Sequence, residues 1–235
     1  MKQFKKGLFI FHRDLRVEDN RGLQQALREC EVVMPIFIFD PIQIGTKNAY
    51  RSQNALQFMA ESLHDLADAL HNRAAKLYVF HGHTDEIIKK LLTHQSIDVV
   101  FANRDYTPFA RARDTHLEEL VNKHKAQWQL VDDTLLTNPD EIFTGSGTPY
   151  TIYTAFFKKA VQQTVLESQV TRGGTFFTGR CEGTITLGNV TKDLYVSNSH
   201  LFTPGGAQEG KKKIRHLSDF KHYTQTRDIP FLATT

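Results

Sequence analysis

A buried strand that runs directly into a dense cluster of charges constrains this chain more than any other segment. Residues 8–11, L-F-I-F, form an apolar run typical of a central strand in a parallel sheet. Asn20 is a good N-cap residue for a helix over the following R-G-L-Q-Q-A-L. Charged and titratable residues therefore gather at the C-terminal end of a first strand, where open α/β sheets bind ligands. They are His12, Arg13, Asp14, Arg16, Glu18 and Asp19.

Strand-like and helix-like patterns alternate through the first half of the chain, as expected for a parallel sheet covered by helices. The longest helical pattern places apolar residues from Leu56 to Leu70 at three- and four-residue steps on one stripe. We therefore predict an α/β fold with a five-stranded doubly wound parallel sheet that ends near residue 135. Strands are expected at residues 8–11, 32–39, 77–80, 99–102 and 129–131, and helices at residues 21–28, 52–72, 84–94 and 109–124.

Several classes of function are disfavoured by what the sequence lacks. Neither the dinucleotide fingerprint G-x-G-x-x-G after the first strand nor a G-x-x-x-x-G-K-[ST] phosphate loop is present. Cys30 and Cys181 show no metal-ligand spacing, so we predict no metal site and no disulfide framework. A net charge of +3 indicates an ordinary solvated surface rather than a nucleic-acid-binding protein. No apolar run is long enough for a signal or membrane segment, so we expect a cytoplasmic protein without a membrane partner.

The charged turn F-H-R-D-L-R-V-E-D-N resembles the opening of the DNA photolyase and cryptochrome family, whose first strand ends in F-R-x-D-L-R-x-x-D-N. His12 stands where the family begins its arginine pair. Four further segments recur in the family's order and approximate spacing, and together they cover nearly the whole chain. They are Y-T-P-F-A-R-A-R-D (106–114), T-G-S-G-T-P-Y-T-I-Y-T-A-F-F-K (144–158), P-G-G (204–206) and Y-T-Q-T-R-D-I-P (223–230).

The resemblance implies three parts. Residues 1–135 form the Rossmann-like antenna domain, and residues 136–206 form a linker that wraps it, with a short helix near 150–163. Residues 207–235 begin an all-helical FAD-binding domain, with a helix expected over residues 207–223. We expect residues from about 207 onward to be poorly ordered, because their apolar side chains pack in the family against helices that this chain lacks. Those side chains are Ile214, Leu217, Phe220 and Phe231.

The family implies a light-driven deoxyribodipyrimidine photolyase, a carbon–carbon lyase that uses FAD to repair cyclobutane pyrimidine dimers in damaged DNA. The chain would be its N-terminal portion, inactive alone because the C-terminal flavin domain is missing. Two alternatives remain: a cryptochrome photosensor, and a free-standing α/β nucleotide-binding module. The second predicts a chain that ends near residue 135, and the long family-like continuation disfavours it.

Only the entrance to the family's flavin site is present. By resemblance, Tyr223, Thr234 and Thr235 correspond to residues at the FAD phosphates, and no catalytic residue is expected in the chain. Judged from the residues alone, Tyr223 would be the end of an amphipathic helix and the two threonines a frayed terminus. We therefore expect the 235-residue chain to bind no FAD by itself.

The remaining charged motifs are interpreted first as structural. We expect Arg13, Asp14, Arg16 and Asp19 to form a salt-bridged turn that orders the end of the sheet, because no nucleophile or general base pair is spaced among them. On the helix over 109–124, surface ion pairs are expected among Arg111, Arg113, Asp114 and Glu118.

The second chromophore of the family, the antenna, occupies the α/β domain. Folate-binding members carry an Asn-Glu pair and a histidine where this chain has Phe109-Ala110 and Lys47. A deazaflavin or flavin is therefore favoured over a folate, and the absence of any antenna is the remaining alternative. Phe109 or Phe39 could stack on such a ring. Candidate antenna-binding residues near the strand ends are Arg13, Asp40, Arg51, Arg104 and Asp105.

Overall fold

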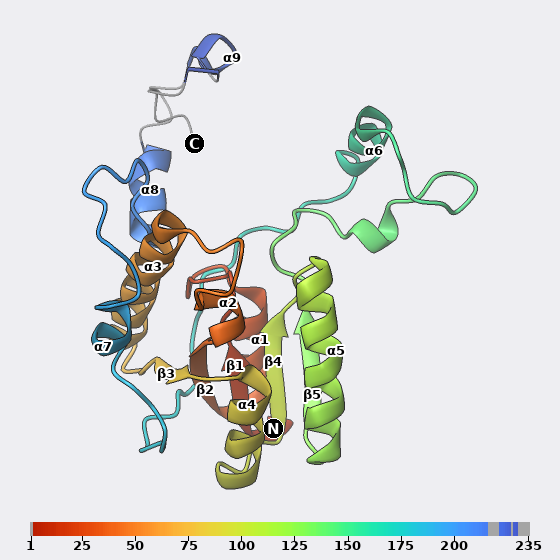
Figure 1. Ribbon diagram of the computed structural model, residues 1–235. Coiled ribbons are helices and arrows are strands. Elements are labelled where there is room, and N and C mark those ends of the chain that lie inside the picture. Colours follow the sequence, from red (N-terminus) through yellow and green to blue (C-terminus); the bar gives the residue numbers. More distant parts are fainter. Residues whose placement is uncertain (1, 216–220, 227, 230–235) are drawn as a thin grey trace.

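A parallel five-stranded sheet forms the centre of the molecule (Figure 1). A computed structural model of the chain describes residues 2–215, 221–226 and 228–229. All four strand pairs are parallel and lie in the order β3-β2-β1-β4-β5, so the predicted doubly wound α/β fold is confirmed. The strands are β1 (Phe4–Ile10), β2 (Cys30–Phe39), β3 (Tyr78–His81), β4 (Val99–Asn103) and β5 (Gln127–Val131).

Helices cover both faces of the sheet. One apolar cluster joins the sheet to α1 (Arg21–Glu29) and α3 (Gln53–His71), and a second joins it to α4 (Thr84–His94) and α5 (Pro108–Lys123). The predicted stripe on α3 is confirmed, since Leu56, Leu63, Leu66 and Leu70 are buried. The remaining short helices are α2 (Pro41–Ile44), η1 (Pro139–Glu141), α6 (Tyr153–Ala160), α7 (Leu187–Thr191), α8 (Ala207–Arg215) and α9 (Tyr223–Thr226).

The first strand begins earlier than its apolar run. β1 starts at Phe4, and the lysines that interrupt its pattern are held by a residue distant in sequence. The backbone amides of Lys5 and Lys6 donate hydrogen bonds of 2.9 and 2.8 Å to one carboxylate oxygen of Asp98. Because this support comes from the segment before β4, local hydrophobicity could not indicate it.

Part of the segment predicted to be a linker lies against the edge of the sheet. Its backbone pairs with Val33 on the part of β2 that β3 leaves open, through Thr175 O and Phe177 N at 2.9 and 2.8 Å. Ile185 then pairs with Val79 on the outer edge of β3. The linker therefore covers a sheet edge that would otherwise expose unpaired backbone groups.

One helix within the linker was not predicted. Residues 165–208 show no sustained helical period, but α7 forms at Leu187–Thr191. Leu187 and Val190 pack against the apolar cluster on the α3 side of the sheet. Tertiary packing therefore forms a short helix that local pattern does not indicate.

The helix expected near residues 150–163 is present as α6, on a segment that projects away from the sheet (Figure 1). Its apolar side chains are largely uncovered: Tyr153 is 74% exposed, Phe157 49% and Val161 60%. Among the described residues, neither of the two buried apolar clusters includes a residue of this helix.

The predicted helix over residues 207–223 is confirmed only in its first half. α8 ends at Arg215, residues 221–222 form a turn, and Tyr223 begins the separate helix α9. Capping rather than an apolar face positions α8: the amide of Ala207 donates to Asp65 at 2.8 Å, while Ile214 is 62% exposed. Leu217, Phe220 and Phe231 lie outside the described residues.

Gly205 allows the linker to touch α3. Its amide donates a 2.7 Å hydrogen bond to Glu61, and an added Cβ would lie 2.1 Å from the carbonyl oxygen of Phe58. We expect Gly205→Ala to release the turn and α8 locally, so that trypsin cleaves at Lys211 about fivefold faster, as a loss of about 1 kcal/mol in local stability implies. The control is Gly188→Ala, where an added Cβ meets no atom within 4 Å. Equal cleavage rates in both variants would contradict the assigned contact.

Candidate functional site

The candidate site lies at the C-terminal ends of β1 and β4, which are neighbours in the sheet. The chain leaves these two strands in opposite directions, toward β2 and toward β5, so a crevice opens between the loops that follow them. A cavity of about 570 Å³ lies there. Its walls are formed by His12, Arg13, Asp14, Asn103, Arg104, Asp105, Tyr106, Thr107, Thr134 and Leu135.

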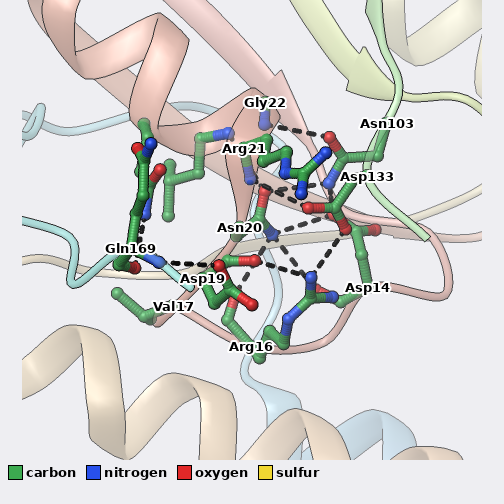
Figure 2. Close-up of polar contacts among 12 residues, drawn as sticks. Asp14, Arg16, Val17, Asp19, Asn20, Arg21, Gly22, Asn103, Asp133 and Gln169 are labelled. Atoms are coloured by element: carbon green, nitrogen blue, oxygen red, sulfur yellow. Dashed lines mark hydrogen bonds and ion pairs between the residues drawn. The ribbon is translucent and has the colours of Figure 1, made fainter. Parts of the chain in front are cut away.

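Beneath the cavity, a buried polar cluster locks the two loops together (Figure 2). Asp14 accepts hydrogen bonds from the backbone of His12 at 2.9 Å, from Asn20 Nδ2 at 3.0 Å and from Asn103 Nδ2 at 2.5 Å. Asn103 Oδ1 accepts from the amide of Gly22, and Asn20 caps α1 through the amide of Leu23. Burial raises the pKa of Asp14, and these hydrogen bonds oppose the rise.

A second set of contacts ties the turn to β5 and to the linker (Figure 2). Arg16 forms a 2.8 Å ion pair with Asp133, whose other oxygen accepts from the amide of Arg21 at 2.9 Å. Asp19, in the left-handed region at φ +51°, exchanges hydrogen bonds with the backbone of Gln169. Asp14, Arg16 and Asp19 therefore have structural partners, but of these three only Arg16 forms a salt bridge, and its partner is Asp133. Asp14 and Asp19 are held by hydrogen bonds instead.

Arg13 differs from the rest of the turn because it reaches the mouth of the cavity. Its side chain is 74% exposed, and its Nη1 atom lies 3.5 Å from Asp105 Oδ2. Burial acts to raise the pKa of Asp105, but hydrogen bonds from Thr107 and the charge of Arg13 outweigh it, so this pKa lies below its usual value. The mouth therefore presents an ionised carboxylate beside a solvated cation.

Arg104 and Tyr106 converge on Asp132 at the other side of the cavity. Both donate hydrogen bonds of 2.8 Å to the same oxygen of Asp132. Burial and this hydrogen bond raise the pKa of Tyr106 to about 12, so the phenol keeps its proton at neutral pH. Tyr106 and Asp132 were not among the predicted site residues, and the Y-T-P-F segment that follows β4 was the signal that could have indicated Tyr106.

His12 contributes an imidazole that stays neutral. Burial, followed by the charge of Arg113, lowers its pKa to about 3, while Asp105 acts in the opposite direction. Its Nε2 atom is buried and has no hydrogen-bond partner in the described part of the chain. In the sequence, His12 was noted among the titratable residues after the first strand and as a departure from the family pattern, but it was not predicted as a site residue.

The expected surface ion pairs on α5 were wrong. Arg113 pairs with the adjacent Asp114 at 2.7 Å, and the two side chains are only 12% and 5% exposed. Arg111 and Glu118 form no ion pair within the described ranges. The charge of Arg113 also lowers the pKa of His12, so this arginine faces the protein interior and not the helix surface.

The five candidate antenna residues do not form one group. Arg13, Arg104 and Asp105 line the cavity. Asp40 instead caps α2 through the amide of Ile42 and accepts hydrogen bonds from Thr84. Arg51 donates to the carbonyl oxygens of Ile44 and Leu194 and thereby fixes a loop.

The other residues named from the sequence differ in how exposed their side chains are. Phe39 is fully buried in the core against Phe37, so it cannot stack on a ligand and that expectation was wrong. Phe109 is 48% exposed and remains available, while Lys47 is exposed. Tyr223 is half-exposed at the start of α9, and Thr234 and Thr235 lie outside the described residues.

The described residues contain neither a candidate metal site nor a candidate membrane span. In the described part of the chain, no histidines, cysteines or carboxylates come together in threes to hold a metal ion. Among the same residues, no helix has the length and apolar character needed to cross a membrane.

Comparison with known proteins gives a consistent set of relatives. The sequence model of DNA photolyase matches residues 8–172. A deoxyribodipyrimidine photo-lyase from Synechococcus sp. is 29% identical over 151 residues, which is 64% of this chain and 31% of that protein. Cryptochrome-2 of Arabidopsis thaliana is 30% identical over 167 residues, 70% of this chain and 27% of that protein.

A solved structure shares the fold over most of the chain. The archaeal photolyase from Sulfolobus tokodaii, described with two FAD molecules and a novel light-harvesting cofactor, superposes with a TM-score of 0.78 at 32% identity. The superposition covers 88% of this chain and 45% of that one. The chain thus spans less than half the length of each of these three relatives.

Proposed function

Because the chain belongs to the DNA photolyase family, we propose that it is the antenna-bearing α/β part of a light-driven deoxyribodipyrimidine photolyase. In this proposal the cavity at the ends of β1 and β4 holds the antenna chromophore. The observation that carries the proposal is the cavity itself, about 570 Å³ at the switch point of the sheet, with Arg13 and Asp105 at its mouth. Ligand sites of this size and position are typical of α/β sheets.

The cavity walls suit a neutral polycyclic ring with a few polar groups. Asp105 is ionised and accepts hydrogen bonds from a ring N–H or O–H, while Arg13 stands beside any acidic substituent. Tyr106 offers its ring as an apolar wall, because its hydroxyl is already committed to Asp132. The bound chromophore supplies light absorption, and these residues bind it and set its orientation.

A deazaflavin or a flavin fits these residues better than a folate. The position at which folate-binding members of the family carry a polar pair is Phe109-Ala110, and Ala110 is buried at the first turn of α5. A pterin ring placed there would leave its polar edge without partners. The Sulfolobus tokodaii photolyase, described with two FAD molecules, supports a flavin in this role.

The repair chemistry belongs in this proposal to the whole protein, which would use FAD and act on damaged DNA. Of the three FAD-phosphate residues inferred by resemblance, Tyr223 alone is described. A cryptochrome photosensor is the second candidate, because Arabidopsis Cryptochrome-2 matches 70% of this chain. Repair of pyrimidine dimers under blue light by the whole protein would support the photolyase and reject the photosensor.

Chromophore titration tests the antenna proposal directly. We expect the chain to bind a deazaflavin or flavin at least about tenfold more tightly than a reduced folate, a difference of roughly 1.4 kcal/mol, because a pterin would forfeit hydrogen bonds at Phe109-Ala110. Fluorescence of each added chromophore gives the dissociation constants. Asp105→Ala is expected to weaken flavin or deazaflavin binding by about tenfold.

The matched control is Asp68→Ala, which removes an exposed carboxylate on α3 that does not line the cavity. It is expected to leave the affinity unchanged. Micromolar folate binding without flavin or deazaflavin binding would contradict the antenna assignment. Equal effects of the two aspartate variants would contradict the position of the site.

A further inference from the structure

We propose that a groove between α1 and the end of the α6 segment binds a nucleotide with a polyphosphate chain. The groove has a volume of about 690 Å³ and lies beside the antenna cavity, with Tyr106 and Leu135 in the wall that the two share. α1 forms one side, residues 131–141 the second, and the returning segment 163–169 the third. The proposal is independent of the antenna assignment.

Two arginines mark the anion-binding side of the groove. Arg21 and Arg28 line it from α1, two helical turns or about 10 Å apart along the axis. Neither guanidinium pairs with a carboxylate among the residues that the structure describes. Arginine presents a planar fork that matches phosphate oxygens, and an extended diphosphate spans more of this distance than a single phosphate does.

The N-terminus of α1 is not itself the anion site. Its first amides are already satisfied: Arg21 N donates to Asp133, Gly22 N to Asn103 and Leu23 N to Asn20. Binding must therefore come from side chains along the helix, where Arg21 and Arg28 are the cations that line the groove.

Gln24 adds a buried acceptor to the wall between the arginines. It is only 6% exposed, and its Nε2 donates to Gln169 O at 2.8 Å and to Thr171 Oγ1 at 3.2 Å. The amide cannot be reversed, because Oε1 would then face the carbonyl oxygen of Gln169. Oε1 is buried and has no donor within the described part of the chain, so the wall at Gln24 favours a ligand N–H over a phosphate oxygen.

Leucines provide a surface for a ring. Leu135, Leu136 and Leu166 line the groove and are 43%, 74% and 60% exposed. Glu141 is also in the lining and accepts a hydrogen bond from Asn138, so one end of the groove favours N–H donors over anions. An anionic chain joined to a flat ring with amino groups could contact the two arginines, the acceptor oxygens and the exposed leucines. A free phosphate could contact only the arginines.

Calorimetric titration of the 235-residue chain with ADP, pyrophosphate and adenosine, in buffer with EDTA, tests the proposal. We expect ADP to bind at least about tenfold more tightly than either pyrophosphate or adenosine, because only ADP engages both sides of the groove. Arg21→Gln and Arg28→Gln are each expected to weaken ADP binding by about fivefold or more. Arg172→Gln, which removes an exposed guanidinium outside the groove, is expected to leave it unchanged.

Three results would overturn the proposal. They are the absence of ADP binding at millimolar concentration, ADP binding that neither arginine variant weakens, and pyrophosphate affinity equal to that of ADP. Circular dichroism of each variant excludes loss of fold as the cause of weaker binding. Because neither Arg21 nor Arg28 lines the antenna cavity, failure here leaves the chromophore titration unaffected.

Discussion

Replacement of Asp14 by alanine is expected to lower the free energy of unfolding by about 3 kcal/mol or more. The variant would leave His12 N, Asn20 Nδ2 and Asn103 Nδ2 without the carboxylate they share, in a region closed to water. The loss is large because the cluster joins the loops after β1 and β4 and holds the cap of α1. Loss of this one acceptor is therefore expected to destabilise both loops and the start of α1.

Urea unfolding at pH 7, followed by circular dichroism, measures this effect. Asp68→Ala removes an exposed aspartate from α3 and is expected to change the free energy of unfolding by no more than about 0.5 kcal/mol. A similar small change for Asp14→Ala would show that the polar cluster is dispensable. In that case the family motif D-L-R-x-x-D-N would need a role other than joining the loops.

Acid is expected to destabilise the protein through His12, with an effect of up to about 2 kcal/mol between pH 6.5 and pH 5. The pKa of His12 is lowered from 6.5 to about 3 by burial and by Arg113. The unfolded chain therefore takes up a proton at this position near pH 6.5, while the folded chain remains neutral. The stability contributed by the neutral imidazole is complete above pH 6.5 and falls by as much as about 1.4 kcal/mol for each unit of pH below it.

The measurement compares the pH dependence of urea unfolding in the parent chain and in His12→Gln, which cannot titrate. The free energy of unfolding of His12→Gln is expected to fall less steeply between pH 6.5 and pH 5. His200→Gln, which removes an exposed histidine, is expected to keep the parent's slope. Identical slopes for the parent and His12→Gln would mean that water reaches the imidazole and that it titrates as an ordinary histidine.

Local pattern predicted the α/β core well, because each strand and helix there carries its own signal. Leu8, Phe9 and Ile10 are at most 1% exposed, as an uninterrupted apolar run at the centre of a sheet requires. The stripe on α3 and the Asn20 cap on α1 are equally local. The start of β1 and the short helix α7 were missed because Asp98 and the apolar cluster beside α3, both distant in sequence, stabilise them.

The candidate site was predicted only in part, because strand ends are local features whereas the partners of loop side chains are distant in sequence. Strand ends could be located from the sequence, and three of the candidates named there, Arg13, Arg104 and Asp105, line the same cavity. Asp40 and Arg51 also follow β2 in sequence, but their side chains turn to Thr84 and to Leu194 and fix loops. Which hydrogen bonds a loop side chain makes depends on the neighbouring segment, and sequence spacing does not contain that information.

By itself, the sequence determined the alternation of strands and helices, the charged turn at the first strand end and the resemblance to photolyases. These are local properties, because a strand or helix shows its period of burial in a few consecutive residues. Only the tertiary structure decided that Asp14 is a buried acceptor that joins two loops, that His12 stays neutral, and that Arg21 and Arg28 line a groove. Those properties depend on which distant groups approach a side chain and whether they exclude water, and only the packed chain sets both.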